Sequence, residues 1–329
     1  MRGMSPLPSY VEALGHGIHA IDTGFHRERF DAAYLVVERG RAAFVDTGTN
    51  GALPRLLGAL DALGLGRDAV DFVIPTHVHL DHAGGAGALM RELPNATMVV
   101  HPRGARHMID PSALYAGALA VYGQAEMDRA YGTLVPVPAE RVRTSDDGGT
   151  VELAGRPLRF ADTPGHARHH HCVWDEASRG WFTGDTFGLS YREFDVDGRA
   201  WILPTSTPVQ FEPDELERSI GRLLAAQPQC MYLTHFGAVG DVERLAALQL
   251  GLLHAMVATA QRHRDAAERP ARLRADLMAL YVDSLRTHGC KLTDTQLEAL
   301  LGLDVGLNVQ GIEAWLDREQ RKAATGATP

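Results

Sequence analysis

A cluster of metal-ligand side chains directly after a short apolar segment constrains this 329-residue chain more than any other feature. Residues 71–75 (DFVIP) are typical of a buried β-strand. Three histidines and an aspartate follow: His77, His79, Asp81 and His82. Imidazole nitrogens and carboxylate oxygens bind divalent cations, and open α/β sheets carry such groups on loops at the carboxyl ends of strands. The pattern favours an α/β fold with a metal-binding loop over a polar surface loop with incidental histidines.

Three further ligand-type side chains also come after predicted strands. The strand and side-chain pairs are 157–161 with His166, 180–182 with Asp185, and 230–233 with His235. Taken singly, either histidine could lie on the surface or in the core, and Asp185 could be a turn residue because aspartate and glycine favour turns. Recurrence of the same strand-to-loop placement is difficult to attribute to chance.

The chain resembles the metallo-β-lactamase superfamily in these motifs. In chain order they are DTG (46–48), HVHLDH (77–82), TPGH (163–166), TGDT (183–186) and THFG (234–237). The resemblance covers residues 15–240 and implies an αβ/βα sandwich of two mixed β-sheets flanked by helices. It points toward the glyoxalase II-like or lactonase-like branches of the superfamily without fixing the subfamily.

The resemblance also implies a dinuclear metal centre. His77, His79 and His166 would hold the first metal, and Asp81, His82 and His235 the second, with Asp185 bridging both. The implied cofactors are two divalent metal ions, with Zn²⁺ preferred and Fe or Mn as alternatives. Such a pair lowers the pKa of a shared water, so a bridging hydroxide would attack the substrate. Asp81 would be both a ligand and the catalytic proton shuttle to the leaving group.

Other residues near these motifs have open roles. Asp46 is either an acceptor that orients a ligand histidine or the cap of the loop that follows it. Arg168 stands where the glyoxalase-like pattern has a glycine, and it either borders the groove or faces solvent. His169 and His170 are candidates for supporting or substrate-binding groups, and we assign neither a ligand role.

The charge of the chain helps to choose between classes of function. The formal net charge of −9 argues against nucleic-acid binding. We expect a metal-dependent hydrolase acting on a small ester, lactone, thioester or amide as its small-molecule substrate. The alternatives are an iron-dependent oxidoreductase or dioxygenase on the same fold, or a phosphodiesterase. A non-catalytic module with structural metal is disfavoured, because structural zinc sites are usually cysteine-rich.

The cysteines and the terminus suggest a cytoplasmic protein without a membrane segment. Cys172, Cys230 and Cys290 are scattered and odd in number, which is typical of reduced thiols. Residues 1–6 lack the apolar segment of a signal peptide. No apolar segment approaches the roughly 18 residues of a membrane span.

The chain is expected to form a catalytic domain over 1–240 and a C-terminal helical extension over 241–329. Within the first, residues 102–148 are predicted to be a helical insertion, which either lines one wall of the substrate groove or merely covers the sheet. In the second, helices are predicted at 243–264, 273–288, 293–301 and 308–322, with Pro270 as a breaker. The extension is a candidate for packing against the core or for forming a homodimer.

Overall fold

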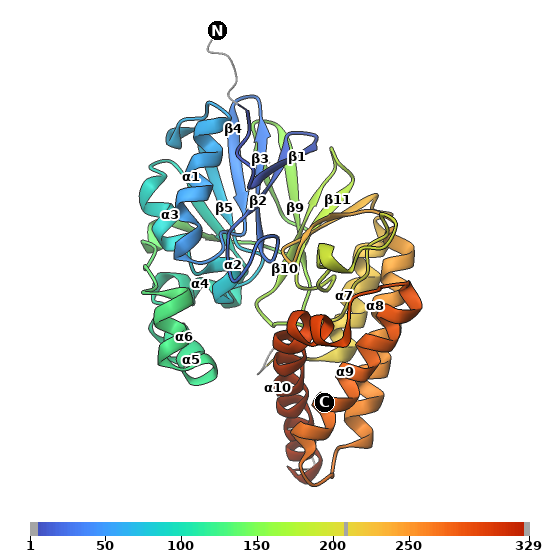
Figure 1. Cartoon of the computed structure of the whole chain (residues 1–329). Helices are drawn as coiled ribbons and strands as arrows, with labels where there is room; N and C mark the ends of the chain where they lie inside the picture. Colours follow the sequence, from blue (N-terminus) through green and yellow to red (C-terminus); the bar gives the residue numbers. More distant parts are fainter. Residues whose placement is uncertain (1–5, 207–209, 326–329) are drawn as a thin grey trace. The chain divides into compact units, whose positions relative to one another are not determined.

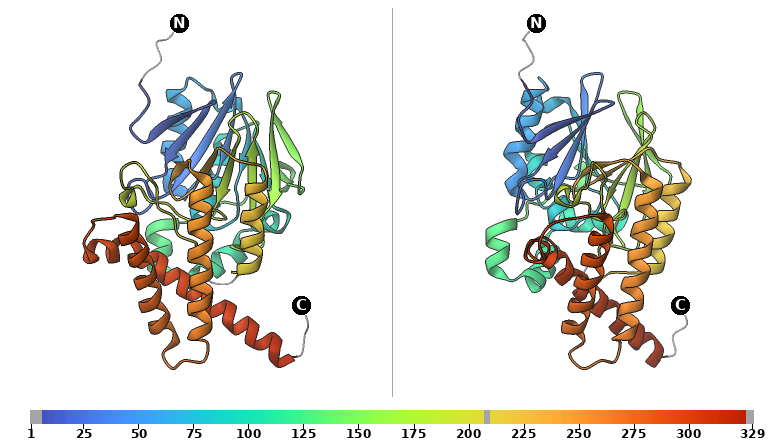
Figure 2. Two further views of the ribbon diagram at one scale, coloured as in Figure 1. Left: turned by 90° about the vertical axis from the view of Figure 1, so that its right-hand side faces the viewer. Right: turned by 45° about the vertical axis from the view of Figure 1, so that its right-hand side comes forward.

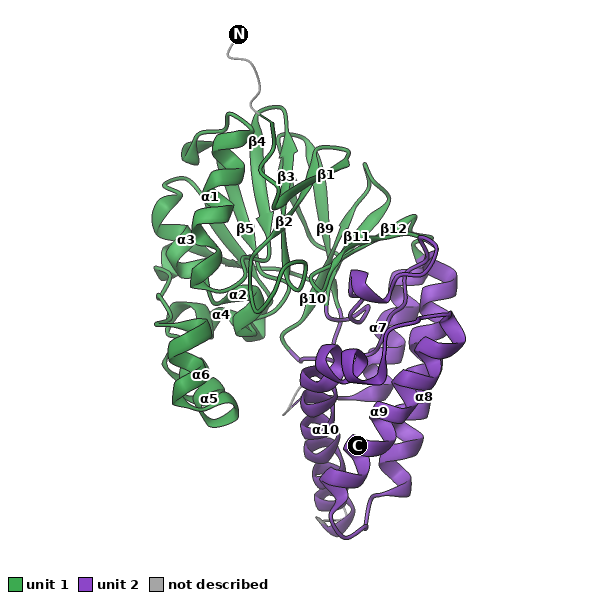
Figure 3. Cartoon of the chain, in the orientation of Figure 1, with its two compact units in different colours: residues 1–162, 169–184, 226–240 green, residues 163–168, 185–225, 241–329 purple. Residues whose placement is uncertain are grey.

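The computed structural model describes residues 6–206 and 210–325. The expectation that the N-terminus lacks a signal peptide concerns residues 1–6, and residues 1–5 lie outside the described residues. Two compact units divide the chain (Figure 3). Unit 1 comprises residues 1–162, 169–184 and 226–240, and unit 2 comprises residues 163–168, 185–225 and 241–329. Within the described ranges, no helix has the length and apolar character needed to cross a membrane.

Unit 1 contains both β-sheets (Figure 1). The first is a seven-stranded sheet in chain order: β1 (Val11–Gly15), β2 (Ile18–Asp22), β3 (Ala32–Glu38), β4 (Arg41–Val45), β5 (Val70–Ile74), β6 (Thr97–Val100) and β7 (Val142–Thr144). Strands β1 to β4 pair antiparallel, and β4 to β7 pair parallel. Two helices, α1 (Leu53–Ala62) and α3 (Ala86–Glu92), share an apolar cluster with this sheet through Leu56 and Leu89.

The second sheet has six strands in the order β13-β12-β11-β10-β9-β8. Their bounds are β8 (Thr150–Leu153), β9 (Arg156–Asp162), β10 (His171–Asp175), β11 (Gly180–Gly184), β12 (Cys230–Leu233) and β13 (Gly237–Val239). Only the β11–β12 pair is parallel. Ile18 and Tyr34 of the first sheet pack in one core cluster with Phe160 and Phe182 of the second. The predicted sandwich of two mixed sheets with flanking helices is confirmed.

Sequence patterns explain why these segments form strands. In β9 the residues Leu158 and Phe160 are buried while Pro157 and Arg159 are exposed, as the two-residue period of a strand with one covered face requires. Strands β10 and β11 are buried along their whole length. Loops that follow the ends of these strands bear the candidate ligands.

The insertion predicted at 102–148 is largely helical. It contains α4 (Pro102–Ile109), α5 (Ser112–Tyr122), the short α6 (Gln124–Glu126) and a π-helical turn at Met127–Tyr131. The segment then closes with β7, which the sequence pattern did not indicate.

Unit 2 is mainly helical, with α7 (Pro213–Ala225), α8 (Val242–Arg262), α9 (Arg269–His288) and α10 (Asp294–Thr325). Figure 2 shows α8 and α9 as neighbouring helices, joined by residues 263–268. Residue 240 is the last residue of unit 1, but segments 163–168 and 185–225 belong with α8–α10. The functional division at residue 240 stays a prediction.

One expectation for the C-terminal helices is met and one was wrong. The predicted break at Pro270 is present, because α8 ends at Arg262 and Pro270 lies in the first turn of α9, where its missing N–H costs no helical hydrogen bond. The helices predicted at 293–301 and 308–322 are one continuous α10. Gly302 weakens the helix locally, but its carbonyl accepts a 3.0 Å hydrogen bond from Nη1 of Arg274 on α9, and this tertiary contact supports the helix there.

Candidate metal centre

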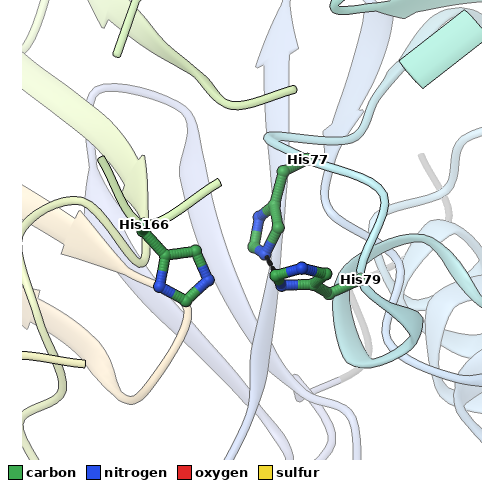
Figure 4. A group of neighbouring side chains, drawn as sticks. All are labelled: His77, His79 and His166. Carbon is green, nitrogen blue, oxygen red and sulfur yellow. Dashed lines mark hydrogen bonds between the residues drawn. The ribbon is translucent and has the colours of Figure 1, made fainter. Parts of the chain in front are cut away.

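The loop after β5 brings the first two predicted ligands together. His77 is fully buried, and its Nε2 lies 2.6 Å from Nδ1 of His79. Figure 4 shows these two ring nitrogens facing each other; it also draws His166, which belongs to unit 2. Two imidazole nitrogens at this distance must share either a proton or a cation, because two lone pairs would repel. The pair is therefore suited to binding a metal.

A second group in unit 1 consists of Asp81, His82 and His235, whose ligand atoms all lie within 4.8 Å of one another. Asp81 and His82 are on the one-turn helix α2 (Leu80–Ala83), and His235 follows β12. The Oδ2 atom of Asp81 is 3.4 Å from Nε2 of His235 and 3.8 Å from Nε2 of His82. Residues 153 positions apart in the sequence thus form one compact set of donors.

Hydrogen bonds fix the orientation of both histidines in this group. His82 Nδ1 lies 2.8 Å from Oδ2 of Asp46, and His235 Nδ1 lies 2.9 Å from the carbonyl oxygen of Phe30. A carboxylate and a carbonyl only accept hydrogen bonds, so each Nδ1 must carry the proton. Each Nε2 then presents its lone pair, which is the form that binds a metal.

The Asp46 carboxylate is the centre of a buried hydrogen-bond network. It accepts from the backbone N–H of Thr76 at 2.7 Å, from the Thr76 hydroxyl at 3.0 Å and from the Thr234 hydroxyl at 2.7 Å, besides His82. These bonds join the ends of β4, β5 and β12. Of the two roles considered for Asp46, the contacts favour the acceptor that orients a ligand histidine.

The two remaining predicted ligands, His166 and Asp185, lie together in unit 2. Nε2 of His166 is 3.2 Å from Oδ2 of Asp185, and both side chains are buried. His166 is in the connection from β9 to β10, and Asp185 directly follows the last residue of β11. The seven predicted ligands therefore form two sets, five residues in unit 1 and two in unit 2.

Contacts inside unit 2 hold both of these residues. Gly165 has a φ of +129°, and a Cβ atom there would lie 2.2 Å from the backbone nitrogen of Leu216, so only glycine fits before His166. The Gln249 side chain of α8 donates a 3.1 Å hydrogen bond to the carbonyl of Thr186, the residue after Asp185. The helical part of the chain thus supports the loop that bears Asp185.

Three residues whose roles the sequence left open are Arg168, His169 and His170, and the structure shows their contacts. Arg168 forms an ion pair with Glu212, which raises the pKa of the guanidinium; the side chain is about half exposed. His170 stacks on His77 with ring centroids 4.8 Å apart, and His169 meets the His79 ring edge-on at 5.3 Å. These two histidines therefore pack against candidate ligands, and their predicted supporting or substrate-binding roles stay predictions.

One buried acid near the cluster had no signal in the sequence. Asp31, directly before β3, is fully buried, and the Thr23 hydroxyl donates to its Oδ2 at 2.9 Å. Burial raises the pKa of Asp31 to about 7. Its position depends on chain segments that are remote in the sequence, so spacing alone could not identify it.

The chemistry of the donor set fits a transition metal. Imidazole nitrogens and carboxylate oxygens suit zinc, iron and manganese alike. Cys172 lies in β10 and donates its thiol to the carbonyl oxygen of Thr183 at 3.5 Å, and neither Cys230 nor Cys290 is among the candidate ligands. The set of donors thus lacks the thiolates of a closed structural zinc site.

Comparison with known proteins concerns the family and the fold rather than the individual metal ligands. The family model described as the metallo-beta-lactamase superfamily matches residues 26–235. The metallo-beta-lactamase fold-containing protein ST1585 of Sulfurisphaera tokodaii is 27% identical over 176 residues, 52% of this chain and 62% of that protein. The chain thus spans less than two thirds of that relative's length.

Two other similarities concern a named enzyme and a solved structure. The acyl-coenzyme A thioesterase MBLAC2 of Bos taurus is 28% identical over 207 residues, 55% of this chain and 68% of that protein. The metallo-beta-lactamase family protein TTHA1429 of Thermus thermophilus superposes with a TM-score of 0.60 at 23% identity, over 84% of this chain and 95% of that one. This structural likeness concerns the fold alone.

Proposed function

Because the chain belongs to the metallo-β-lactamase superfamily, we propose that it is a metal-dependent hydrolase of a small acyl substrate such as an ester, thioester, lactone or amide. One observation carries the proposal. Asp81, His82 and His235 form a compact nitrogen and oxygen donor set, in which hydrogen bonds from Nδ1 turn the lone pairs of both histidines inward. Structural histidines in a core would have no need of this common orientation.

In this proposal two divalent metal ions bind the seven residues. His77, His79 and His166 would hold one ion, Asp81, His82 and His235 would hold the other, and Asp185 would be shared between them. His166 and Asp185 are suited to these roles because the chain fixes them next to the ends of β9 and β11. When bound, two such cations acidify a water molecule and polarise the acyl carbonyl.

The protein's own groups orient the site and move the proton. Asp81 retains 25% exposure of its side chain, whereas His82 is fully buried. The Asp81 carboxylate is therefore the group of this set best placed to exchange a proton with the leaving group or with solvent. Asp46 and the Phe30 carbonyl keep the two histidines in one tautomer throughout turnover.

A thioester is the first substrate class to test. The similarity to a protein named as an acyl-coenzyme A thioesterase supports it, and the net charge of −9 weighs against polyanionic nucleic acids. Zinc is the preferred metal, with iron or manganese as alternatives that the donor set also accepts.

The test is metal analysis combined with a substrate panel. Protein loaded with zinc, manganese or iron is assayed on thioesters, lactones, β-lactams and phosphodiesters, and metal per chain is measured after removal of excess ions. We expect about two metal ions per chain and hydrolysis of an acyl substrate. Activity that appears only with iron and requires oxygen would replace this proposal with an oxidoreductase, and turnover of phosphodiesters alone would replace it with a phosphodiesterase.

A variant distinguishes the bridging role of Asp185. Asp185→Asn should lower the occupancy of both metals together, since one carboxylate is proposed to contact both. Asp214→Asn, an exposed aspartate in the first turn of α7 in the same unit, is the matched control and should retain full occupancy. Loss of a single metal in Asp185→Asn would disprove the bridge.

A further inference from the structure

One cavity of unit 1 is lined by charged side chains that are not among the candidate metal ligands. It has a volume of about 200 Å³, and residues of β1, β2, the connection 23–31 and α1 line it. Its charged lining residues are Arg29, Arg55, Glu12, Asp22 and Glu28. The proposed hydrolase chemistry uses none of them, so this group of charges calls for an explanation of its own.

The guanidinium of Arg55 is fixed at this cavity. Its Nη1 donates to the carbonyl oxygen of Asp22 at 2.9 Å and lies 3.3 Å from Oδ2 of the same residue. Its central carbon lies 5.3 Å from the centre of the Tyr10 ring, which is a cation–π contact. Among the described residues, Nε and Nη2 of Arg55 have no acceptor, so both donors are open to a ligand.

Two glycines make room for this arrangement. A Cβ atom at Gly24 would lie 2.8 Å from Cζ of Arg55, and a Cβ atom at Gly58 would lie 2.4 Å from the hydroxyl oxygen of Tyr10. A larger residue at either position would therefore displace the guanidinium or the ring behind it. The position of Arg55 is thus determined by its surroundings, unlike that of a freely solvated surface arginine.

The Asp22 carboxylate is already occupied by the protein. Besides its contact with Arg55, it accepts hydrogen bonds from the backbone N–H groups of Gly24 at 2.9 Å and Arg29 at 3.2 Å. Asp22 therefore holds the wall of the cavity and has little capacity left for a ligand.

The other charges at the cavity are close together but poorly paired. The guanidinium carbon of Arg29 lies over the Phe236 ring, 5.1 Å from its centre, and Nη2 reaches Glu12 only at 3.5 Å. Glu28 lines the same cavity and forms no ion pair within the described ranges. Two glutamates thus face the cavity together with the open N–H groups of two arginines.

We propose that this cavity binds a small α-amino acid in its zwitterionic form. Its carboxylate would accept charge-assisted hydrogen bonds from Arg29 and Arg55, and its ammonium group would lie toward Glu12 and Glu28. A purely anionic ligand would be repelled by the two glutamates, and a purely cationic ligand by the two guanidiniums. A ligand that carries both charges matches both parts of the lining. Such binding requires neither a metal ion nor the proposed hydrolase activity.

The test compares L-alanine with two analogues that each keep one of its charges. Propionate lacks the ammonium group, and ethylamine lacks the carboxylate. Dissociation constants are measured by ligand-observed NMR with the full chain, both zinc-loaded and metal-free. We expect L-alanine to bind equally to both forms and each analogue to bind at least about tenfold more weakly, because each loses one set of charge-assisted hydrogen bonds.

Variants locate the binding in the cavity. Arg29→Gln and Glu28→Gln, both at exposed positions, should each weaken L-alanine binding at least about tenfold. Gly58→Ala keeps every charged group but crowds the Tyr10 ring behind Arg55, and it should also weaken binding. The matched controls are Arg159→Gln on β9 and Glu152→Gln on β8, which change exposed residues of the same types outside the cavity and should bind as the unaltered protein does.

Three results would overturn the inference. The first is the absence of measurable L-alanine binding, and the second is binding of propionate or ethylamine as tight as that of L-alanine. The third is binding that requires zinc or is undiminished in Arg29→Gln and Glu28→Gln, because the amino acid would then coordinate the metal instead of occupying this cavity.

Discussion

The four hydrogen bonds that converge on Asp46 lead to a prediction about metal affinity. Its carboxylate accepts from two groups of Thr76, from Thr234 and from His82. Asp46→Asn replaces one acceptor oxygen with a donor, so at least one of these bonds must break and His82 loses its fixed orientation. We expect zinc affinity to fall about 10- to 100-fold, measured by competition with a chromophoric chelator.

The matched control for Asp46 is another aspartate of the same sheet. Asp71 on β5 forms a partly exposed ion pair with Arg41. Asp71→Asn should leave the zinc affinity unchanged. Equal affinity of Asp46→Asn and the unaltered protein would show that Asp46 does not orient a ligand.

A second prediction concerns His171, a buried histidine. Burial, with a contribution from His101, lowers its pKa to about 3, and its Nδ1 lies 2.7 Å from the Ser145 hydroxyl. In the unfolded chain a histidine has a pKa of about 6.5. The unfolded state therefore binds more protons between these values, so the stabilising contribution is complete above pH 6.5 and is lost as the pH falls toward 3.

Protonation of His171 in the unfolded chain makes the free energy of unfolding depend on pH. One such histidine contributes a slope of at most about 1.4 kcal/mol per pH unit. His171→Gln should reduce the slope of the unfolding free energy between pH 6.5 and 4.5, measured by urea denaturation of the metal-free protein. His254→Gln, at a mostly exposed histidine of α8, should keep the slope of the unaltered protein. An unchanged slope in His171→Gln would mean that His171 is protonated in the folded state.

The candidate ligands could be predicted from the sequence because each of them lies shortly after a recognisable strand. Strand-to-loop placement could be recognised from neighbouring residues at His77, His166 and Asp185 alike. The orienting contacts were not accessible in this way. Thr234 meets Asp46 from 188 positions away, and no spacing rule predicts such a hydrogen bond.

Between elements, one buried ion pair joins β9 to β10. Nε and Nη2 of Arg156 donate to the two carboxylate oxygens of Asp175 at 2.7 and 2.6 Å, and both side chains are at most 5% exposed. Arg156→Met leaves the Asp175 charge buried without its partner. The free energy of unfolding should fall by about 3–5 kcal/mol, measured by chemical denaturation.

The exposed Arg41–Asp71 pair between β4 and β5 gives the control for this prediction. Its side chains are 37 and 27% exposed. Arg41→Met should therefore cost at most about 1 kcal/mol. Similar losses in both variants would mean that burial does not decide the strength of these pairs.

Strands and helices could be predicted from the sequence where their apolar residues follow a clear pattern. The prediction failed where contacts with residues distant in the sequence determine whether a segment is helical or extended. Strand β9 and helix α1 could be predicted because their periods match one buried face, and β3 because it is a short apolar segment that is buried along most of its length. The continuity of α10 depends on contacts with α9 such as Arg274 with Gly302, which no local pattern contains. The three-residue β7 is similarly too short to carry a period of its own.

The C-terminal helices should be required for the solubility of the full chain. The segment 185–206 has little regular structure but buries several large apolar side chains, namely Phe187, Leu189, Tyr191, Phe194, Trp201, Ile202 and Leu203. Trp201 donates to Ser284 of α9 at 2.9 Å, and Asn308 of α10 accepts from the Ser206 backbone at 2.7 Å. A chain that ends after Gly240 lacks these partners and exposes the apolar segment.

We therefore expect the chain ending after Gly240 to aggregate, because exposed apolar patches of this size associate. Light scattering and binding of an apolar dye would measure the effect. The control ends after Glu319, which removes the exposed end of α10 and leaves its buried Leu316 in place; it should stay monodisperse. Because Gln249 supports the loop of Asp185, the shorter chain should also lose the metal that it would otherwise bind. A soluble, monomeric chain of 240 residues with unchanged metal content would show that the helices are a dispensable appendage.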